Sequence, residues 1–439
     1  MDYSLDSLLK NDGFECPSCG RRHFGLLKDC IIKDGAMGCI PELVKKYGAS
    51  YPFVLCDENT YKAAGETVCG ILDGNGIKYF LHIIGRDKPS PDEKTIGEAI
   101  MYCPTACDCV IGIGGGVIND TSKVVASQKK VPEIIVATAP SMDGFASATS
   151  SVERSGLKIS LNSKCPEAVV ADSEIIVRAP KRMILSGIGD MLAKYVSIVE
   201  WKIANILVGD YYCETIAEIV RSSLAQCIAG SKGALNGDRK AVCSVIEGLV
   251  VSGLAMNYAG ISRPASGMEH YISHITDMRA LEFGTPDDFH GIQCGIATLT
   301  VIKAYEELVK RIPNRDKALA SVASFDLEKW NNHLKERLGH GADAIIAGEE
   351  KERKYDKEKH AHRLKIIIEN WDTITKIISE LPKSSDIEKF MLDIGHPTKP
   401  EEIGLTADDW HEAFGMAKDI RDKYILGRLL WDLGETGIG

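Results

Sequence analysis

The spacing of hydrophobic positions changes part-way along the chain. Between about residue 50 and residue 180, short apolar runs rich in β-branched residues alternate with stretches of helical periodicity. This alternation predicts βαβ units on a parallel sheet, with helices long enough for right-handed crossovers. The strands expected from it are 53–56, 79–84, 110–113 and 134–137, and the helices between them include 61–72 and 93–102.

Strand signals almost vanish from Ala179 onward. Long amphipathic stretches follow and predict helices over 183–206, 213–229 and 241–256. We place the boundary at Ala179 and Pro180, because proline is tolerated in the first turn of a helix but not in its interior. The expected organisation is an N-terminal extension (1–34), a Rossmann-like dinucleotide-binding domain with a parallel sheet (35–179), and an all-helical domain (180–439).

Composition restricts the classes of partner. The 439 residues carry a net charge of -10, which argues against a general nucleic-acid or anionic-membrane surface but leaves room for a local basic pocket that binds one phosphate. The first residues lack the basic head of a signal peptide, and no apolar stretch approaches the roughly 20 residues that span a bilayer. We therefore expect a cytoplasmic protein with no nucleic-acid partner, no membrane insertion and reduced cysteines.

A glycine-rich turn follows the strand expected at 110–113. Gly114, Gly115 and Gly116 lead directly into a helix start, where backbone N–H groups can approach a pyrophosphate. The pattern departs from the usual dinucleotide fingerprint, whose last glycine would fall at Val117. A tight turn with no ligand is the alternative.

Two more polar segments stand at strand ends. Asp57 follows the first expected strand, where a carboxylate can bind an adenosine ribose and repel a 2'-phosphate, although such an acid is also a common N-cap. The stretch 137–147 contains Thr138, Ser141 and Asp143 and leaves the strand at 134–137. Cofactor and substrate meet at this edge of a parallel sheet, and a capped loop is the alternative.

Three histidines gather within about 20 residues. His270 and His274 are four residues apart, so on a helix they share one face, and His290 follows closely. Asp190 stands in the segment GIGDMLAKY. Two imidazoles and a carboxylate can hold a catalytic divalent metal with positions open for substrate, whereas a helix-surface coincidence is the alternative.

The order of these motifs resembles the iron-containing alcohol dehydrogenase and dehydroquinate synthase superfamily. The shared order is GGGxxxDxxK, a hydroxyl-rich loop with aspartate, GIGDMLAKY, HxxxH and HG, and it covers most of the chain from about residue 35. MDGFASATSSV, SGMEHYISHITDM and the late GHPTKPEEIGL with AKDIRDKYILGRLLWDLG look most like the bacterial sn-glycerol-1-phosphate dehydrogenases within it. The implied fold is dehydroquinate synthase-like.

The resemblance also implies roles for residues. The metal ligands fall on Asp190, His270 and His290, with His274 near the nicotinamide and the proton path and Asp143 contacting the polyol hydroxyls. Lys158 and Lys164 stand where dehydroquinate synthases carry substrate-binding lysines, and a surface position is the alternative. The cofactor-binding residues expected are Asp57, Gly114, Gly115, Gly116, Asp120, Thr138 and Ser141.

The implied reaction interconverts dihydroxyacetone phosphate and sn-glycerol 1-phosphate by hydride transfer with NAD, NADP being possible as well. The divalent metal is zinc, nickel, iron or manganese, and a homo-oligomer of two or more chains is expected. The alternatives are glycerol dehydrogenase, a dehydroquinate-synthase-like or inosose-synthase-like lyase, which usually has glutamate where Asp190 stands, and a catalytically silent scaffold or metal sensor.

The N-terminal segment precedes the part that resembles the superfamily. It contains Cys16 and Cys19 in a CxxC spacing, with His23 and Cys30 nearby. These residue types suit a structural zinc ion. A single CxxC without a second well-spaced pair is also compatible with ordinary buried thiols.

Overall fold

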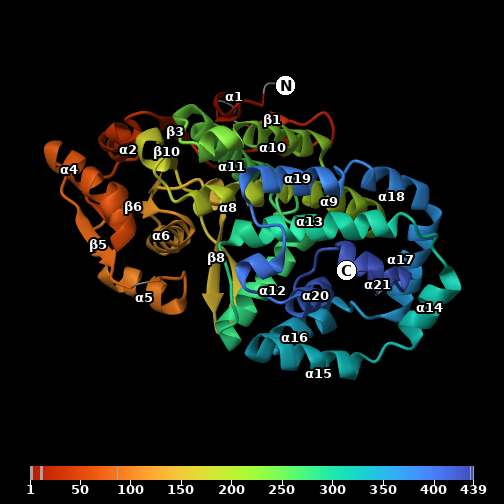
Figure 1. The fold of residues 1–439 in the computed structure, drawn as a ribbon. Helices are drawn as coiled ribbons and strands as arrows, with labels where there is room; N and C mark the ends of the chain where they lie inside the picture. Colours follow the sequence, from red (N-terminus) through yellow and green to blue (C-terminus); the bar gives the residue numbers. More distant parts are fainter. Residues whose placement is uncertain (1–2, 10–12, 87, 436, 439) are drawn as a thin grey trace. The chain divides into compact units, whose positions relative to one another are not determined.

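The computed structural model describes residues 3–9, 13–86, 88–435 and 437–438 (Figure 1). The chain forms two compact units, each made of segments that are separate in the sequence. The sheet unit comprises Met1–Arg154, Lys158–Met191 and Thr215–Ile261, and the helical unit comprises Ser155–Leu157, Leu192–Glu214 and Ser262–Gly439.

A six-stranded sheet forms the centre of the sheet unit. All of its strand pairs are parallel, and the order is β3-β10-β7-β6-β4-β5. Its middle strands are buried on both faces, as expected for a parallel sheet covered by helices. The strands are β3 (Asp29–Lys33), β4 (Pro52–Asp57), β5 (Phe80–Ile84), β6 (Cys109–Gly114), β7 (Glu133–Ala137) and β10 (Ala168–Asp172).

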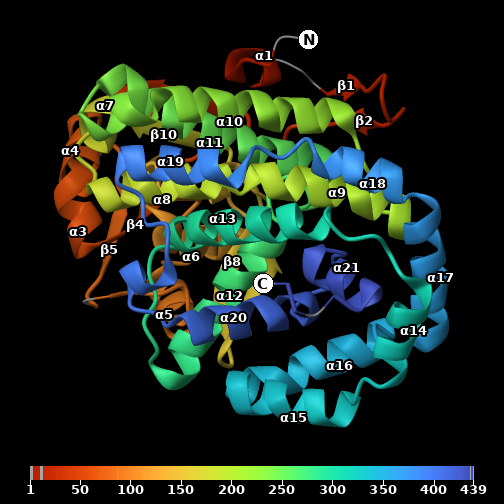
Figure 2. The same ribbon diagram turned by 45° about the vertical axis from the view of Figure 1, so that its right-hand side comes forward.

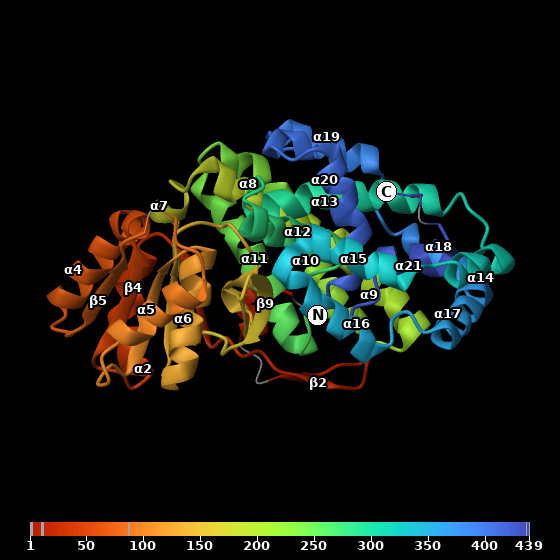
Figure 3. The ribbon, with the colours of Figure 1, turned by 90° about the horizontal axis from the view of Figure 1, so that it is seen from below.

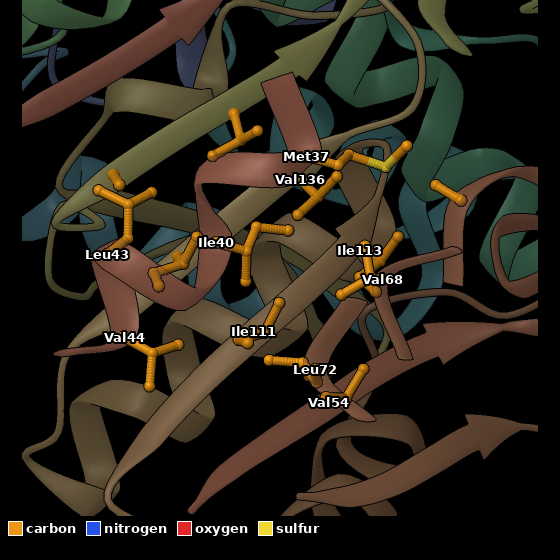
Figure 4. Packing of buried hydrophobic residues seen from close by; sticks show 14 of the residues in the cluster. Met37, Ile40, Leu43, Val44, Val54, Val68, Leu72, Ile111, Ile113 and Val136 are labelled. Carbon is orange, nitrogen blue, oxygen red and sulfur yellow. The ribbon is translucent and has the colours of Figure 1, made fainter. Parts of the chain in front are cut away.

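Alternate residues of the strands enter two separate cores. Val54 and Ile111 point into the core beneath α2 and α4, which Figure 4 shows at close range. Phe53 and Val110, one residue earlier on the same strands, enter the core beneath α5 and α6, which lie side by side in Figure 3. The helices of this unit before residue 180 are α1 (Leu5–Leu9), α2 (Ile40–Lys46), α3 (Glu58–Thr60), α4 (Glu66–Gly74), α5 (Glu93–Tyr102), α6 (Gly116–Lys129) and α7 (Ser173–Ile176), with 3-10 turns η1 (Ala36–Cys39) and η3 (Gly144–Ala146) and a π-helix η2 (Tyr61–Gly65).

Long helices from later in the chain complete the sheet unit. They are α8 (Lys181–Leu192), α10 (Glu214–Leu235) and α11 (Arg239–Ala259). Among the described residues, α11 is the one helix long and apolar enough to cross a membrane, with a mean hydropathy of 1.5 in its most apolar window. The expectation that no apolar stretch approaches such a length was therefore wrong for α11. Since 67% of that window is buried, it has the character of a core helix.

Two short hairpins supplement the main sheet. β1 (Phe14–Glu15) pairs with β2 (Arg22–His23) in the N-terminal segment. β8 (Thr149–Arg154) and β9 (Leu157–Asn162) form the other two-stranded sheet.

The helical unit contains no strand among its described residues after Leu157. Helices α12 and α13 pack against each other at its centre (Figure 2). Its helices are α9 (Lys194–Val208), α12 (Met268–Phe283), α13 (His290–Leu308), α14 (Arg315–Ala323), α15 (Leu327–Leu338), α16 (Ala342–Glu352), α17 (Lys357–Glu369), α18 (Trp371–Ile378), α19 (Ser384–Ile394), α20 (Ala407–Met416) and α21 (Leu426–Leu433), with 3-10 turns η4 (Gly339–Gly341), η5 (Pro400–Ile403) and η6 (Ala417–Asp419).

The predicted fold class is confirmed: a parallel α/β sheet is followed by a helical half. The four expected strands are present with ends shifted by at most one residue, but β3 and β10 were not foreseen. The stretch expected as one helix over 183–206 is divided between α8 and α9 at Ala193. The expected boundary at Ala179 is the point after which the chain forms only helices. The compact units are divided differently, because α10 and α11 pack with the sheet although they lie after this boundary.

The first prediction concerns Glu133 at the start of β7, which is 1% exposed and lies 2.6 Å from the Ser122 hydroxyl. Burial raises the pKa of Glu133 to about 8, although the hydrogen bond with Ser122 lowers it. Folding thus favours the protonated carboxyl. Its contribution to the free energy of unfolding is fully present below about pH 4.5, the ordinary pKa of this group, and is lost as the pH rises through about 8. Glu133→Gln should reduce the fall in stability between pH 5 and pH 8 by on the order of 1 kcal/mol or more.

Urea unfolding followed at several pH values measures this effect. An exposed carboxyl on a helix, Glu328 of α15, offers the control, since Glu328→Gln should leave the pH dependence unchanged. Parallel pH profiles for the parent chain and Glu133→Gln would contradict the prediction.

Candidate functional site

The glycine turn has the expected strand-turn-helix geometry. Gly115 is the N-cap of α6 in an extended conformation, and no side chain caps the helix start. A Cβ at Gly114 would lie 2.6 Å from the Ile118 side chain, so the close contact of strand end and helix requires glycine there. The backbone N–H groups at this helix start form the type of surface that binds a phosphate. Nucleotide binding by Gly114, Gly115 and Gly116 remains a prediction.

Asp57 lies at the end of β4, and its carboxylate caps α3. It accepts a hydrogen bond from the Thr60 N–H at 2.8 Å, and the Thr60 hydroxyl accepts one from the Asp57 N–H. The capping alternative is therefore realised. One carboxylate oxygen can cap a helix while the other contacts a ribose, so the cofactor role of Asp57 stays a prediction.

The loop after β7 is held by a fully buried lysine. Lys123 on α6 donates to the carbonyl oxygen of Gly144, to the Ser147 hydroxyl at 3.0 Å and to the Thr149 carbonyl at 3.4 Å. A buried ammonium group must have such acceptors, because desolvation otherwise makes its charge very unfavourable. The lysine of the GGGxxxDxxK pattern thus fixes the path of this loop.

Asp120, one turn earlier on α6, has an unusual environment. Burial raises the pKa of Asp120 to about 6, against the lowering effects of Lys123 and Lys158. Lys158, a predicted substrate ligand on β9, is half-buried, whereas Lys164 is exposed. The substrate-binding role of Lys158 remains a prediction, and Lys164 has the surface character that was its alternative.

Asp143 and Asp190 come together inside the sheet unit. The backbone N–H of Asp143 donates to the Asp190 carboxylate at 2.9 Å, and the Ser252 hydroxyl donates to the Asp143 carboxylate at 2.9 Å. Both aspartates are buried. The loop also contains Thr138 and Ser141, which are 7% and 6% exposed. Residues far apart in the sequence therefore form one buried polar group at the sheet end.

Two glycines allow helices to approach this loop closely. A Cβ at Gly187 of α8 would overlap the carbonyl oxygen of Pro140. A Cβ at Gly253 of α11 would lie 2.8 Å from the carbonyl oxygen of Asp143. Backbone atoms cannot move aside as a flexible side chain can, so both positions require glycine.

The three predicted histidines converge within the helical unit. His270 and His274 lie on α12, and His290 is the first residue of α13. The ring centroids of His270 and His290 are 5.0 Å apart, and those of His274 and His290 are 5.6 Å apart. His270 and His274 are 6% and 8% exposed, and His290 is half-buried. The surface-coincidence alternative therefore does not describe these side chains.

Hydrogen bonds orient two of the rings for metal binding. His270 Nδ1 is 2.9 Å from a carboxylate oxygen of Glu269, which can only accept, so Nδ1 donates and Nε2 carries the lone pair. His290 Nδ1 is 3.0 Å from the Ser273 hydroxyl, where either atom can be the donor, and the same hydroxyl accepts from the Gln293 amide at 3.1 Å. A carboxylate partner of the kind that holds His270 fixes the tautomer of histidines that bind metals through Nε2. The donor set therefore fits a divalent metal.

The sequence reasoning missed several groups around these rings. Glu269 precedes His270 directly, and Cys294 follows His290 by four residues, the same one-face spacing that had linked His270 and His274. The Cys294 sulfur is 3.5 Å from His290 Nε2. Burial raises the pKa of Cys294, but His270 and His290 outweigh burial and lower it below its ordinary value.

The described residues thus offer more than one ligand set in this unit. Donor atoms of His270, His290 and Cys294 lie within 4.8 Å of one another, and so do those of His274, Asp277 and His290. His290 is common to both sets.

Two residues were expected to join Cys16 and Cys19: His23 lies with them, and Cys30 does not. Donor atoms of Cys16, Cys19 and His23 lie within 4.8 Å of one another. Cys30 lies on β3 and is not in this group, so its predicted membership was wrong. Burial raises the pKa of Cys16, but its hydrogen bonds with the Ser18 and Thr215 side chains and with the backbone lower it to about 5.

Comparisons with known proteins give the family. A model of the iron-containing alcohol dehydrogenase family matches residues 31–180. A glycerol-1-phosphate dehydrogenase (NAD(P)+) from Bacillus velezensis is 35% identical over 285 residues, which are 64% of this chain and 72% of that protein. The chain belongs to the glycerol-1-phosphate dehydrogenase family. Another relative of that name, from Halalkalibacterium halodurans, is 27% identical over 416 residues, 94% of each chain.

A solved structure agrees with the fold of this family. The iron-containing alcohol dehydrogenase of Thermotoga maritima aligns with a TM-score of 0.55 over 94% of this chain and 99% of that one. At 13% identity this likeness shows the shared fold alone.

Membership of the glycerol-1-phosphate dehydrogenase family leaves the site assignments to be tested. The sheet unit brings Asp143 and Asp190 together, and the helical unit brings His270, His274 and His290 together. Asp190 and the histidines belong to different units, so their union as one ligand set stays a prediction.

The second prediction tests the close approach of α8 to the loop. Gly187→Ala should destabilise the sheet unit by about 1–3 kcal/mol, because the new Cβ meets a backbone carbonyl that cannot yield without moving the chain. Gly97→Ala on α5 is the matched control, since a Cβ there meets nothing within 4 Å and alanine favours a helix by about 1 kcal/mol. Thermal unfolding of both variants provides the measurement, and equal stability of the two would contradict the packing described here.

Proposed function

We propose that this protein interconverts dihydroxyacetone phosphate and sn-glycerol 1-phosphate, with NAD or NADP as hydride carrier and one divalent metal. Family membership supports the substrate class. The observation that carries the proposal is the pair His270 and His290: their ring centroids are 5.0 Å apart, and the Glu269 carboxylate holds Nδ1 of His270, which leaves its Nε2 for a metal.

The proposed metal ligands are Asp190, His270 and His290. The order of motifs in the sequence supports Asp190, and the tautomer that Glu269 sets for His270 and the closeness of the two rings support the two histidines. When bound, such a metal polarises the carbonyl group, and the nicotinamide supplies the hydride. Zinc, nickel, iron and manganese all accept this donor set. The zinc expected at Cys16 and Cys19 would be structural and separate.

The other residues bind and orient. Asp143 would accept hydrogen bonds from the polyol hydroxyls, and the bonds from Ser252 and to Asp190 support its fixed orientation. Lys158 would contribute positive charge toward the substrate phosphate. His274 would exchange the proton of the reacting oxygen, because imidazole can give and take protons near neutral pH.

The proposed cofactor surface is the glycine turn with the start of α6. The small residues at Gly114, Gly115 and Gly116 support a close approach of a pyrophosphate. Asp57 at the end of β4 would repel a 2'-phosphate, which favours NADH over NADPH. We place this activity in the cytoplasm and expect a homo-oligomer.

The third prediction compares substrates. With NADH, the kcat/KM for dihydroxyacetone phosphate should exceed the value for dihydroxyacetone by at least about tenfold, since a lost phosphate contact costs more than 1.4 kcal/mol. Absorbance of NADH measures the rates, and NADPH in the same assay should be used less efficiently. A higher kcat/KM for glycerol in the reverse direction would favour glycerol dehydrogenase instead. Phosphate release without net NADH consumption would favour a lyase.

The fourth prediction concerns the metal ligands. His270→Ala and His290→Ala should abolish turnover and lower the bound metal, because each removes one imidazole ligand. His274→Ala should keep its metal and lose roughly 10²–10⁴-fold in kcat, the range of general acid-base groups. NADH binding, measured by fluorescence titration, should survive in all three.

The control is His362→Ala, which changes an exposed histidine on α17. It should retain full metal and full activity. A His270→Ala protein with full metal content and full activity would contradict the ligand assignment. Inactivity of the parent chain with every metal tested would instead support a silent scaffold.

A further inference from the structure

The N-terminal segment of the sheet unit carries a second group of metal-binding side chains. Cys19 Sγ lies 3.3 Å from His23 Nε2, and Cys16 completes a group with donor atoms within 4.8 Å of one another. In a tetrahedral zinc site, with bonds of about 2.3 Å to sulfur and 2.0 Å to nitrogen, a sulfur and a nitrogen ligand stand about 3.6 Å apart. These side chains therefore stand near the spacing that zinc requires.

The backbone around the two cysteines is shaped as a tight turn. The Gly20 N–H donates to the Cys16 carbonyl at 2.9 Å, and the Cys16 N–H donates to the Arg21 carbonyl at 2.9 Å. Gly20 has a φ of 67°, a conformation that favours glycine. This turn joins β1 to β2 and brings His23, at the end of β2, back toward both thiols.

The orientation of His23 is an independent indication of a metal. His23 is 2% exposed, and its Nδ1 is 2.8 Å from the backbone carbonyl of Tyr258. A carbonyl only accepts, so Nδ1 donates, and in the neutral ring the lone pair is on Nε2, the atom next to Cys19 Sγ. This is how histidine ligands of zinc are held by a carbonyl behind them.

The sulfur of Cys16 is surrounded by hydrogen-bonding groups. It lies 3.2 Å from the Ser18 hydroxyl and 3.3 Å from the Thr215 hydroxyl, and both are buried or partly buried with it. The Cys16 thiol donates to the Thr215 hydroxyl, and the Ser18 hydroxyl can donate to the sulfur, which favours the thiolate that binds metals.

We propose that Cys16, Cys19 and His23 hold a structural zinc ion. Thiolates and imidazoles are the ligands typical of structural zinc sites. Each thiol gives up its proton as the zinc–sulfur bond forms, and no oxidation or reduction takes place. The zinc stabilises the β1–β2 hairpin. The centre is independent of the proposed dehydrogenase activity.

The fifth prediction is a loss of zinc on cysteine replacement. In the full-length His270→Ala protein, which lacks a ligand of the proposed catalytic site, elemental analysis should find about one zinc per chain. Adding Cys19→Ser should remove that zinc and lower the thermal midpoint. Adding His23→Ala should weaken zinc binding by at least about tenfold in competition with a chromophoric chelator. Cys30→Ser, on β3, is the matched control and should keep the zinc.

If Cys19→Ser does not fold, removal of the metal with a chelator tests the proposed zinc site instead. Stripping the otherwise unaltered full-length protein should lower its thermal midpoint and expose the N-terminal segment to limited proteolysis, and added zinc should reverse both effects. Equal zinc in the Cys19→Ser and Cys30→Ser proteins would overturn the proposal. So would a His270→Ala protein that holds no zinc, or a Cys16 to Cys19 disulfide found by mass spectrometry in freshly purified protein.

Discussion

The burial of the Lys123 ammonium group is the constraint on which the sheet unit's site depends. Lys123 is 0% exposed, and its charge is tolerated because three oxygen atoms of the segment 144–149 accept its hydrogen bonds. A different path of this segment would leave the charge buried without those acceptors. The lysine therefore fixes the loop that carries Asp143, and Gly187 and Gly253 let two helices close on it.

The helical unit uses buried carboxylates in the same way. Glu269 accepts from the Gly267 N–H at 2.6 Å and from His270, so the histidine ring cannot turn without breaking a charged hydrogen bond. Glu200 accepts from the Met268 and Leu426 N–H groups at the start of two helices. Burial and the nearby Glu269 raise the pKa of Glu200 to about 8, which limits the negative charge that this region must hold. The ring of His270 is thus oriented by a network that begins outside any metal site.

The fold could be predicted from the sequence where neighbouring residues form a recognisable hydrophobic pattern. The strand 110–113 and the helix 93–102 were visible because a short apolar run and helical periodicity are local properties. β3 and β10 were missed because β3 is only half-buried and lies before the βα pattern, and β10 belongs to no βαβ spacing that the sequence displays. The glycine turn was found for the same reason as the strands: its residues are consecutive.

The candidate sites could likewise be predicted only where their residues are close in sequence. His270 and His274 were found because their helical spacing is local, whereas the contact of Asp143 with Asp190 joins segments 47 residues apart. Cys30 is close to Cys19 in sequence, but the fold does not bring it into the group formed by Cys16, Cys19 and His23. Spacing identifies candidate residue types, and only the fold selects among them.

Sequence spacing also could not distinguish the roles of the two histidines of α12. Spacing makes His270 and His274 equivalent, since both lie on one face. Their surroundings differ: a carboxylate holds Nδ1 of His270, whereas the ring of His274 lies nearly parallel to that of His290, at an interplanar angle of 18°. A ring fixed by a carboxylate is suited to hold a metal, because its tautomer cannot change. A proton-transferring ring must alternate between protonation states, so the ring that Glu269 fixes is the less suited of the two to that role.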